Sequence, residues 1–278
     1  MKFSIITISY NQAAFLERTL RSVLMQSYPE IEYIVVDPGS TDGSRDIIER
    51  YRDRLGKVIL EPDTGAADGL NKGFAASSGD VLGFLNSDDI LFPGTVAAAA
   101  RFFAKAPNVD VVSGHARILS SDDRVLRVAY SDAMSVKKYI YGGVVLIQPS
   151  TFFRREAYRR TGGFNVDNHS TWDGELFLEM ARKGACFSRC DEIWSGYRLH
   201  GQSITASKRL QQDSYEQHVR LFSSVMGRAP SRLDGVLRGA FRIARPILNP
   251  RDAWERLARG PVYGRKLDCQ ESERALGS

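Results

Sequence analysis

The chain has 278 residues, 43% of them hydrophobic and 26% charged, and its formal net charge is +5. This composition is that of an ordinary globular protein and excludes the fibrous and intrinsically disordered classes. No apolar run reaches the eighteen or so residues of a membrane-spanning helix, and the first residues lack the features of a secretory signal. The three cysteines form no Cys-x-x-Cys pair, which argues against a disulfide framework or a zinc site, so we expect a cytosolic protein.

Strands and helices are predicted to alternate through the first hundred residues. Apolar and β-branched runs predict strands at 3–8, 31–36, 57–60 and 80–85, and apolar residues at helical spacing predict a helix after each of them. Such alternation with short loops is typical of a parallel sheet with helices on both faces. Because open α/β sheets bind ligands beyond the carboxyl ends of their strands, the loops there are the candidate site.

The pattern continues less regularly in the second hundred residues. We predict a strand at 109–113, a hairpin within 115–130, a strand at 151–153 and a helix from 171 to 183. The fold class is therefore α/β, with a mostly parallel central sheet and helices on both faces.

Carboxylates follow three of the predicted strands. Asp37 and Asp63 each follow one strand, and the pair Asp88 and Asp89 follows another. Adjacent carboxylates repel each other, and a divalent cation or a polyhydroxyl ligand would offset that repulsion. A capped turn is the alternative interpretation of the pair.

Three acidic strand ends on one rim suit a nucleoside diphosphate. Its base and ribose need hydrogen-bond acceptors, and its pyrophosphate needs Mg²⁺ or Mn²⁺ between itself and the acids. The glycine-rich dinucleotide motif and the phosphate loop ending in Gly-Lys-Ser/Thr are both absent, which argues against a nicotinamide dehydrogenase or a mononucleotide kinase.

These segments resemble the inverting family 2 glycosyltransferases with a GT-A fold, of the bacterial surface-polysaccharide type. The matches follow the family's order and spacing over about residues 1 to 205. They are Ser-Tyr-Asn at 9–11, Val-Asp-Pro-Gly-Ser-Thr-Asp-Gly at 36–43, Glu-Pro-Asp at 61–63, Asp-Gly-Leu-Asn-Lys-Gly at 68–73, Gly-Asp at 79–80, Asn-Ser-Asp-Asp at 86–89, Gly-Gly-Phe at 162–164 and Trp-Asp-Gly-Glu-Leu at 172–176. One departure is Pro38, where an acid, Gly or Asn often stands.

The resemblance implies that several of these side chains bind a nucleotide sugar. Tyr10 and Asp37 would hold the base, with Ser9 beside them, and Asp63 and Asp88 would hold the base and ribose.

The resemblance also implies a metal and a phosphate contact. Asp89 would bind Mn²⁺ or Mg²⁺ under the diphosphate, and Lys72 would lie near the phosphates. A solvated helix residue is the alternative for Lys72.

The catalytic base implied by the resemblance is Asp173. The family's helix usually opens with Glu-Asp, and here Trp172 replaces the Glu. Glu175 is the second candidate for the base, and a simple helix cap is the alternative role for Asp173.

Residues 197–200, Tyr-Arg-Leu-His, match an Arg-x-His pattern that the family has at a strand end. His200 could complete the metal shell, and Arg198 could bind the donor and neutralise the leaving group. A structural histidine is the alternative for His200.

The expected reaction is a metal-dependent single displacement. Asp173 takes the proton of an acceptor hydroxyl while that oxygen attacks the anomeric carbon, so the configuration inverts. We expect a UDP-sugar as the first choice of donor and a lipid-linked or polysaccharide glycan as acceptor. A non-catalytic nucleotide-sugar-binding module is the main alternative, and a nucleotidyltransferase is disfavoured because residues 9–18 contain no glycine-rich basic loop.

The positive charge is concentrated near the carboxyl terminus. Residues 1–227 contain 27 basic and 27 acidic residues, whereas residues 228–266 contain 10 basic and 3 acidic residues. We therefore divide the chain into a nucleotide-sugar-binding half (1–110), an acceptor-binding and catalytic half (111–207) and a basic helical extension (208–278). Such a charge asymmetry indicates an anionic partner surface, and we expect no nucleic acid partner.

The extension should contain an amphipathic helix at 231–248. Its predicted apolar stripe does not include Arg238, Arg242 or Arg245, which lie on other faces of the helix. Ser231 and Asp234 have the spacing of a capping box, and Pro246 should bend or end the helix. The members of the stripe are Leu233, Val236, Leu237, Ala240, Phe241, Ala244 and Leu248. The helix could pack on its own domain, pack on a second subunit in a homodimer, or lie with residues 231–266 on the anionic inner face of the cytoplasmic membrane.

Overall fold

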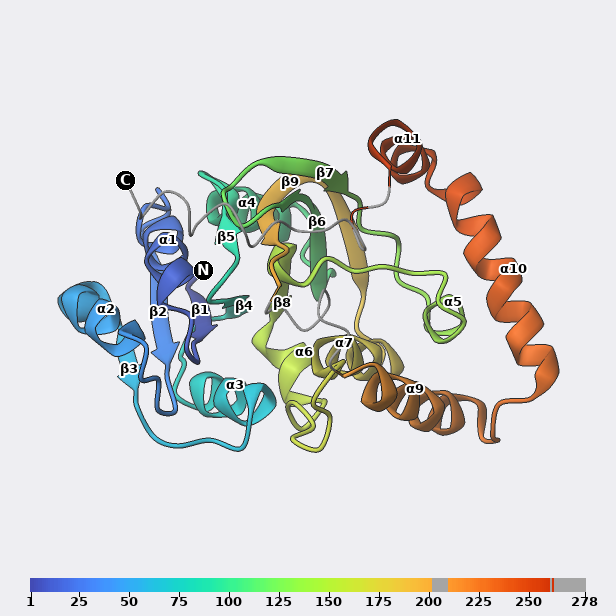
Figure 1. The fold of residues 1–278 in the computed structure, drawn as a ribbon, viewed down its shortest axis with the longest axis horizontal. Coiled ribbons are helices and arrows are strands. Elements are labelled where there is room, and N and C mark those ends of the chain that lie inside the picture. The colour runs from blue at the N-terminus through green and yellow to red at the C-terminus, as the bar shows by residue number, and fades with distance from the viewer. Residues whose placement is uncertain (202–209, 261, 263–278) are drawn as a thin grey trace, which may run out of the picture.

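The computed structural model describes residues 1–201, 210–260 and 262 (Figure 1). The predicted alternation of strands and helices in the first half is present, so the α/β class is confirmed. In chain order the described elements are β1 (Phe3–Ile8), α1 (Ala13–Leu24), β2 (Ile31–Val36), α2 (Ser44–Tyr51), η1 (Arg52–Arg54), β3 (Lys57–Ile59), α3 (Ala66–Ala75), β4 (Val81–Asn86), β5 (Ile90–Leu91), α4 (Thr95–Lys105), β6 (Val111–Leu119), β7 (Val125–Ala129), α5 (Val136–Ile140), η2 (Gln148–Ser150), β8 (Thr151–Arg154), α6 (Arg155–Arg159), α7 (Trp172–Arg182), β9 (Phe187–Arg198), α9 (Gln211–Met226), α10 (Arg232–Leu248) and α11 (Pro250–Arg259).

One mixed sheet joins both halves of the chain. Its strand order is β3-β2-β1-β4-β8-β6-β9-β5, and β7 pairs with β6. β1 is parallel to β2 and β4, and β2 is parallel to β3, whereas β8 is antiparallel to both β4 and β6. The carboxyl ends of β1, β2 and β4 therefore open at the same edge.

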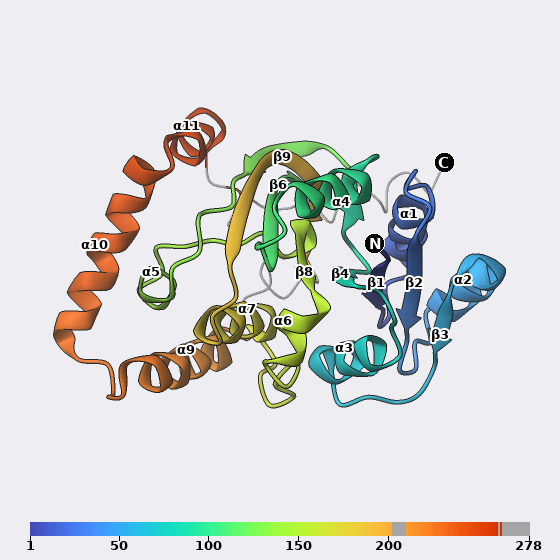
Figure 2. The ribbon, with the colours of Figure 1, turned by 180° about the vertical axis from the view of Figure 1, so that it is seen from behind.

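Helices cover both faces of the sheet because its central strands are apolar on both sides. Phe3 and Ile5 of β1 are buried against α1, α2 and α4, while Ile6 of the same strand is buried against α3. Successive side chains of a strand point to opposite faces, so a strand with no polar face has to be covered twice. Figure 2, seen from behind, shows the same layers around the central strands.

The predicted hairpin is β6–β7, and β6 also includes most of the strand that we expected at 109–113. Two strands, β5 (Ile90–Leu91) and β9 (Phe187–Arg198), were not predicted from the residue pattern. β5 has only two residues, and β9 contains Ser188, Arg189, Asp191 and Glu192, which interrupt its apolar pattern. β9 is a strand because it pairs along β6 over eight register positions, a long-range contact that local sequence does not encode.

The described part of the carboxyl-terminal extension is helical, as expected. The capping box of Ser231 and Asp234 is present at the start of α10. Pro246 lies inside α10, which continues two residues further to Leu248, and α11 begins at Pro250. Residues 261 and 263–266 of the predicted surface segment lie outside the described residues.

α10 is attached to the domain through one of its faces. The hydroxyl of Tyr141 donates to Asp234 Oδ1 at 2.8 Å, and the Tyr141 ring stacks on Phe241 with centroids 5.4 Å apart. Near the other end of α10, Arg245 Nε donates to Asp132 Oδ2 at 2.8 Å. The helix therefore packs on its own domain through this face.

Among the helices of the described part of the chain, none combines the length and the apolarity that spanning a bilayer requires.

Candidate functional site

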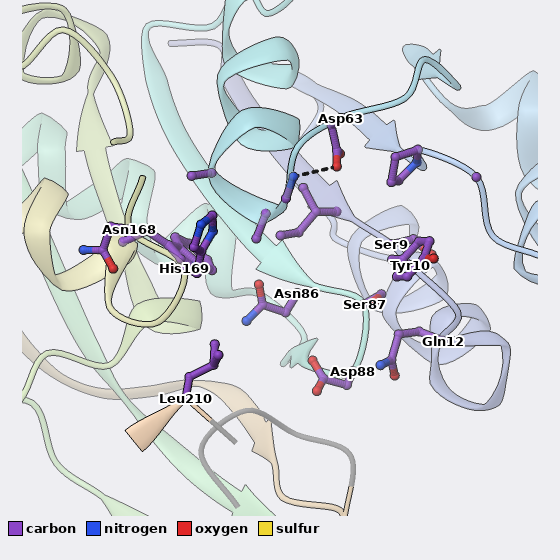
Figure 3. A pocket seen from close by; sticks show the side chains of 17 residues that line it. Ser9, Tyr10, Gln12, Asp63, Asn86, Ser87, Asp88, Asn168, His169 and Leu210 are labelled. Atoms are coloured by element: carbon purple, nitrogen blue, oxygen red, sulfur yellow. Dashed lines mark hydrogen bonds between the residues drawn. The ribbon is translucent and has the colours of Figure 1, made fainter. Parts of the chain in front are cut away.

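A cavity of about 800 Å³ opens at the carboxyl ends of β1 and β4 (Figure 3). The loop after β2, the start of α3 and the segment before α7 complete its walls. Among the residues that line it are Ser9, Tyr10, Asp63, Asn86, Asp88 and Trp172. We call it the first cavity, and it lies where the strand pattern predicted a site.

Ser9 and Tyr10 both line the first cavity, as predicted. Ser9 follows β1 and is buried, and Tyr10 lies at the rim with 61% of its surface exposed. Among the described residues the Ser9 hydroxyl has no hydrogen-bond partner. A buried hydroxyl beside a cavity is a group that a ligand can satisfy.

Asp37 lies behind the wall of the first cavity rather than in it. Its side chain is fully buried and accepts hydrogen bonds from Gly39 N, from Ser40 N and Oγ, and from Arg45 Nε. Burial alone would raise the pKa of Asp37, but these hydrogen bonds outweigh it and lower the pKa below its usual value. Pro38 and Gly39, held in place by Asp37, line the cavity instead.

Asp63 lies in the wall of the first cavity, and Lys72 does not. Asp63 Oδ1 accepts a hydrogen bond of 3.0 Å from Gly65 N, drawn in Figure 3, and burial raises the pKa of Asp63. Lys72 Nζ donates to Pro62 O at 2.5 Å and lies 3.2 Å from Asp68 Oδ2. The ammonium group of Lys72 is thus occupied outside the cavity wall.

The adjacent acids Asp88 and Asp89 lie in different environments. Asp88 lines the first cavity, and its Oδ2 is 3.0 Å from His200 Nε2. Asp89 is 1% exposed and does not line the cavity, and its Oδ1 accepts a hydrogen bond of 2.8 Å from Arg198 N. Burial, together with the charge of Asp88, raises the pKa of Asp89 well above its usual value. Of the pair, Asp88 is therefore the one that faces the first cavity, while Asp89 Oδ2 is a buried oxygen without a hydrogen-bond partner among the described residues.

Arg198 is buried behind Asp88 and does not line the first cavity. Its Nε donates to Asp88 O at 2.8 Å, its Nη1 donates to Ser120 O at 3.1 Å, and Nη1 lies 2.5 Å from Asp123 Oδ1. Its guanidinium also lies over the Phe15 ring, 5.2 Å from the centroid. Arg198 thus connects the Asp88 backbone to the turn between β6 and β7.

Asp173 lines a neighbouring cavity of about 290 Å³, which we call the second cavity. Tyr197 lines it from β9, Tyr130 from the residue after β7, Gln148 from η2, and Arg245 and Asp252 from the extension. Burial raises the pKa of Asp173, and its Oδ1 accepts a hydrogen bond of 2.8 Å from Gly174 N. The adjacent residue, Trp172, lines the first cavity, so α7 begins between the two cavities.

The two cavities meet at the pair Asn86 and Gln148. Asn86 lines the first cavity and Gln148 the second, and Asn86 Nδ2 lies 3.5 Å from Gln148 Oε1. This pair therefore lies between the first cavity and the second cavity, whose wall includes Asp173.

Glu175 has a structural environment. Its carboxylate is buried and accepts hydrogen bonds from Asn165 and Asn168, and it pairs with Arg220 of α9. These contacts hold the segment before α7 and fasten α9, so Glu175 faces neither cavity.

The family model for "Glycosyl transferase family 2" matches residues 4–162. The chain belongs to glycosyl transferase family 2. A glycosyltransferase of Nostoc sp. is 36% identical to it over 72% of this chain and 66% of its own length. TuaG of Bacillus subtilis (strain 168), a glycosyltransferase provisionally assigned to teichuronic acid biosynthesis, is 31% identical over 74% of this chain and 82% of its own length.

Solved structures of glycosyltransferases share the fold of this family 2 member. S. aureus TarS 1–349 in complex with UDP-GlcNAc has a TM-score of 0.68 at 20% identity, over 99% of this chain and 78% of that chain. The mannosyltransferase PcManGT from Pyrobaculum calidifontis, in complex with GDP-Man and Mn²⁺, has a TM-score of 0.63 at 22% identity, over 99% of this chain and 79% of that chain. The GT-A fold expected from the resemblance is thereby confirmed.

The side chains of this glycosyltransferase that could ligate a metal fit a cation that is also bound by a diphosphate. In the part of the chain that the structure describes, no three His, Cys, Asp or Glu side chains cluster as a metal cage. Asp88 and His200 instead offer one carboxylate and one imidazole, which approach each other at 3.0 Å. Mg²⁺ and similar ions are commonly held by one or two carboxylates, substrate phosphates and water, so two protein ligands suffice.

Several cavity residues were not predicted from the sequence. Asn86, Asn168 and His169 line the first cavity, and Gln148 lines the second. Asn86 could have been found, because it opens the same Asn-Ser-Asp-Asp segment as Asp88. His169 and Gln148 lie in irregular segments whose position depends on long-range packing.

Proposed function

We propose that this family 2 glycosyltransferase moves a sugar from a nucleoside diphosphate sugar to an acceptor hydroxyl, with inversion and with Mn²⁺ or Mg²⁺ as cofactor. A UDP-sugar is our first choice of donor, because the fold neighbour TarS was solved with UDP-GlcNAc. A lipid-linked or polysaccharide glycan is our choice of acceptor, in keeping with the provisional assignment of TuaG. We place the reaction in the cytosol, with residues 1–110 binding the donor and residues 111–207 binding the acceptor.

The observation that carries the proposal is the position of Asp88 and Asp173 at adjoining cavities. The first cavity, with Ser9, Tyr10, Asp63 and Asp88, takes the nucleoside diphosphate. The second cavity, with Asp173 in its wall, takes the acceptor. A base on the acceptor side and a diphosphate site on the donor side are what a displacement across the anomeric carbon requires.

Asp173 accepts the proton of the acceptor hydroxyl as that oxygen attacks the anomeric carbon. The bond between the anomeric carbon and the diphosphate breaks, and the nucleoside diphosphate leaves from the opposite side. Burial raises the pKa of Asp173, which makes its ionised form a stronger base than an exposed aspartate. The cation, when bound, supplies positive charge that stabilises the departing diphosphate.

The structure supports Asp88 with His200, rather than Asp89, as the residues that would hold the cation. Asp88 lines the first cavity and lies 3.0 Å from the buried His200. Asp89, by contrast, does not line the cavity: its Oδ1 accepts from Arg198 N, and its Oδ2 has no hydrogen-bond partner among the described residues. Arg198 acts through the Asp88 backbone and supports the site without touching the donor.

Titration calorimetry with UDP-sugars, with and without Mn²⁺, tests this assignment. Asp88→Asn should lose the Mn²⁺-dependent part of binding, while Asp89→Asn should retain it, because an amide oxygen can still accept from Arg198 N. The exposed Asp53→Asn serves as the matched control. The reverse result, with binding lost in Asp89→Asn and kept in Asp88→Asn, would overturn the assignment.

The stereochemistry provides an independent test. Proton NMR of the transfer product should give the anomeric configuration opposite to that of the donor sugar. Net retention would exclude the single displacement, and binding of the donor without any transfer to a panel of glycans would favour the non-catalytic module.

A further inference from the structure

The outer surface of α10 and α11 is unusually apolar for a solvent-facing surface. Of fifteen large hydrophobic side chains that are exposed in the described chain, eight lie on these two helices. They are Leu233, Val236, Leu237, Ile243, Ile247, Leu248, Trp254 and Leu257, with exposures between 38% and 79%. Scattered apolar side chains are normal on a protein surface, whereas such a concentration marks an interaction site.

The exposure of these side chains does not result from a failure of α10 to pack, because α10 contacts its domain through another face. Phe241 stacks on Tyr141 and Arg245 bonds to Asp132 on the inner side of the helix. Val236, Ile243 and Ile247 are separated by intervals of seven and four residues, which places them on one outer face of the helix. One face of α10 thus packs on its domain, and the opposite face is exposed and available to a partner.

Cationic side chains accompany this outer surface. Arg232 and Arg242 of α10 are exposed, and among the described residues no carboxylate lies within ion-pair distance of either. Arg251, Arg256 and Arg259 of α11 each pair with an acid, and Arg256 lines the second cavity, so the available charge of this outer surface is that of Arg232 and Arg242. Residues 228–266 contain 10 basic and 3 acidic residues, so the partner should be anionic as well as apolar.

We propose that the outer surface of α10 and α11 is an interfacial membrane-binding surface that lies on an anionic lipid bilayer. Apolar side chains on one helix face with arginines around them are the pattern that inserts at the boundary between lipid headgroups and acyl chains. A bilayer fits better than a second copy of the chain. In a two-fold symmetric dimer through this face, Arg232 and Arg242 would be buried without an acidic partner, because no described carboxylate lies within ion-pair distance of either.

The same two helices line the second cavity with their other side. Arg245 of α10 and Asp252 and Arg256 of α11 contribute to its wall, opposite the sheet residues and near Asp173. A helix with its side chains is about 10 Å thick, so the bilayer would lie about one helix away from that cavity. This placement rests on the proposed function, and it would bring the glycan of a lipid-linked acceptor to the base.

Co-sedimentation of the full chain with phosphatidylcholine vesicles, with and without phosphatidylglycerol, tests the proposal. The native chain should bind the anionic vesicles, and added salt should weaken that binding. Ile243→Ser with Ile247→Ser should lower the binding at least about ten-fold, because two exposed isoleucines would no longer enter the bilayer. Arg232→Gln with Arg242→Gln should lower it about five-fold for each arginine on anionic vesicles only.

Matched variants elsewhere on the surface control for general effects of composition. Met25→Ser with Val166→Ser removes two exposed apolar side chains, and Arg21→Gln with Arg101→Gln removes two exposed arginines, outside the extension. Neither pair should change vesicle binding. Circular dichroism and thermal unfolding confirm that each variant remains folded, and donor binding by calorimetry should be unchanged in all of them.

Two outcomes would overturn the membrane proposal. One is equal binding of both vesicle types by the native chain and by the variants of α10. The other is a native dimer, seen by light scattering, that the Ile243→Ser and Ile247→Ser pair dissociates while no vesicle binding occurs, which would assign the surface to a second copy. Because vesicle binding is measured without donor, either result leaves the proposed transfer reaction to its own tests.

Discussion

The two cavities are built from the chain in different ways. Part of the wall of the first cavity is a loop that closes within a few residues, in which Asp37 binds Gly39, Ser40 and Arg45, while Asn168, His169 and Leu210 line the same cavity from later segments. The second cavity depends on elements that are far apart in sequence, with Arg245 and Asn249 fastened to Asp132 across more than a hundred residues. Changes in α10 and α11 should therefore disturb the proposed acceptor side more than the proposed donor side, because these two helices line the second cavity and not the first. Mutations should therefore be able to impair sugar transfer without impairing the binding of the sugar donor.

The largest effect should come from Asp173→Asn. Loss of the base should lower kcat about 10²- to 10⁴-fold, while the donor Kd stays the same because Asp173 does not line the first cavity. Steady-state kinetics with calorimetry measures both quantities. A native rate in this variant would remove Asp173 from the mechanism, and Glu175→Gln should differ from it by losing stability through its contacts with Asn168 and Arg220.

Asp132→Ala should disturb the acceptor side alone. Asp132 and Arg245 are 11% and 12% exposed, and breaking such a buried ion pair costs about 3 kcal/mol. We expect faster hydrogen exchange in α10 and α11 and a higher KM for the acceptor, with an unchanged donor Kd. Asp122→Ala, which breaks an exposed pair with Arg124, should change stability by less than about 1 kcal/mol. A shift in donor Kd would contradict the independence of the two sides.

The acid limb of transfer should report the titration of Asp173, and donor binding has to be measured beside it because burial also raises the pKa of Asp63 in the first cavity. Burial raises the pKa of Asp173 above its ordinary value of 3.8, so the base becomes protonated, and transfer is lost, as the pH falls through that raised value. Below it kcat should fall about ten-fold per pH unit. Asp37 has a lowered pKa and stays ionised over the same range, so the loop that it holds should persist until the pH falls below its ordinary value of 3.8. An acid limb of kcat that survives in Asp173→Asn would show that another group titrates.

The smallest effect is expected for Lys72→Gln. The Lys72 ammonium is engaged by Pro62 O and Asp68 and does not line the first cavity, so the donor Kd should change less than about two-fold. A ten-fold weaker donor would mean that Lys72 moves to the phosphates on binding, as the family resemblance implies.

The strand pattern was sufficient to predict the parallel half of the sheet and the edge where the site lies. Asp63, Asp88 and Tyr10 line the first cavity because each directly follows or lies near a strand end, a position that local sequence determines. The hydrogen bonds that occupy the Asp37 carboxylate could also be predicted locally, since an Asp followed by Gly39 and Ser40 is typical of a turn closed by the aspartate side chain.

Other features depend on contacts that no local pattern encodes. Asp88 and Asp89 are neighbours in sequence, and only the pairing of β5 with β9 determines that Asp89 is buried under Arg198 N. The second cavity needs η2, β9, α7, α10 and α11 to meet, so its walls could not be derived from spacing. The apolar stripe of α10 was predicted, but which part of it packs on Tyr141 and which part stays exposed depends on where the domain provides a partner.

The double use of α10 and α11 has a consequence for how such enzymes diversify. One short segment supplies part of the second cavity, which is our proposed acceptor site, through Arg245 and Asp252, and it also carries the outer surface with Ile243 and Ile247. If both proposals hold, an exchange of residues 228–260 between relatives would change acceptor specificity and membrane binding in a single recombination event. The specificity for the sugar donor would stay the same. Chimeric enzymes made at that boundary should inherit the two traits together.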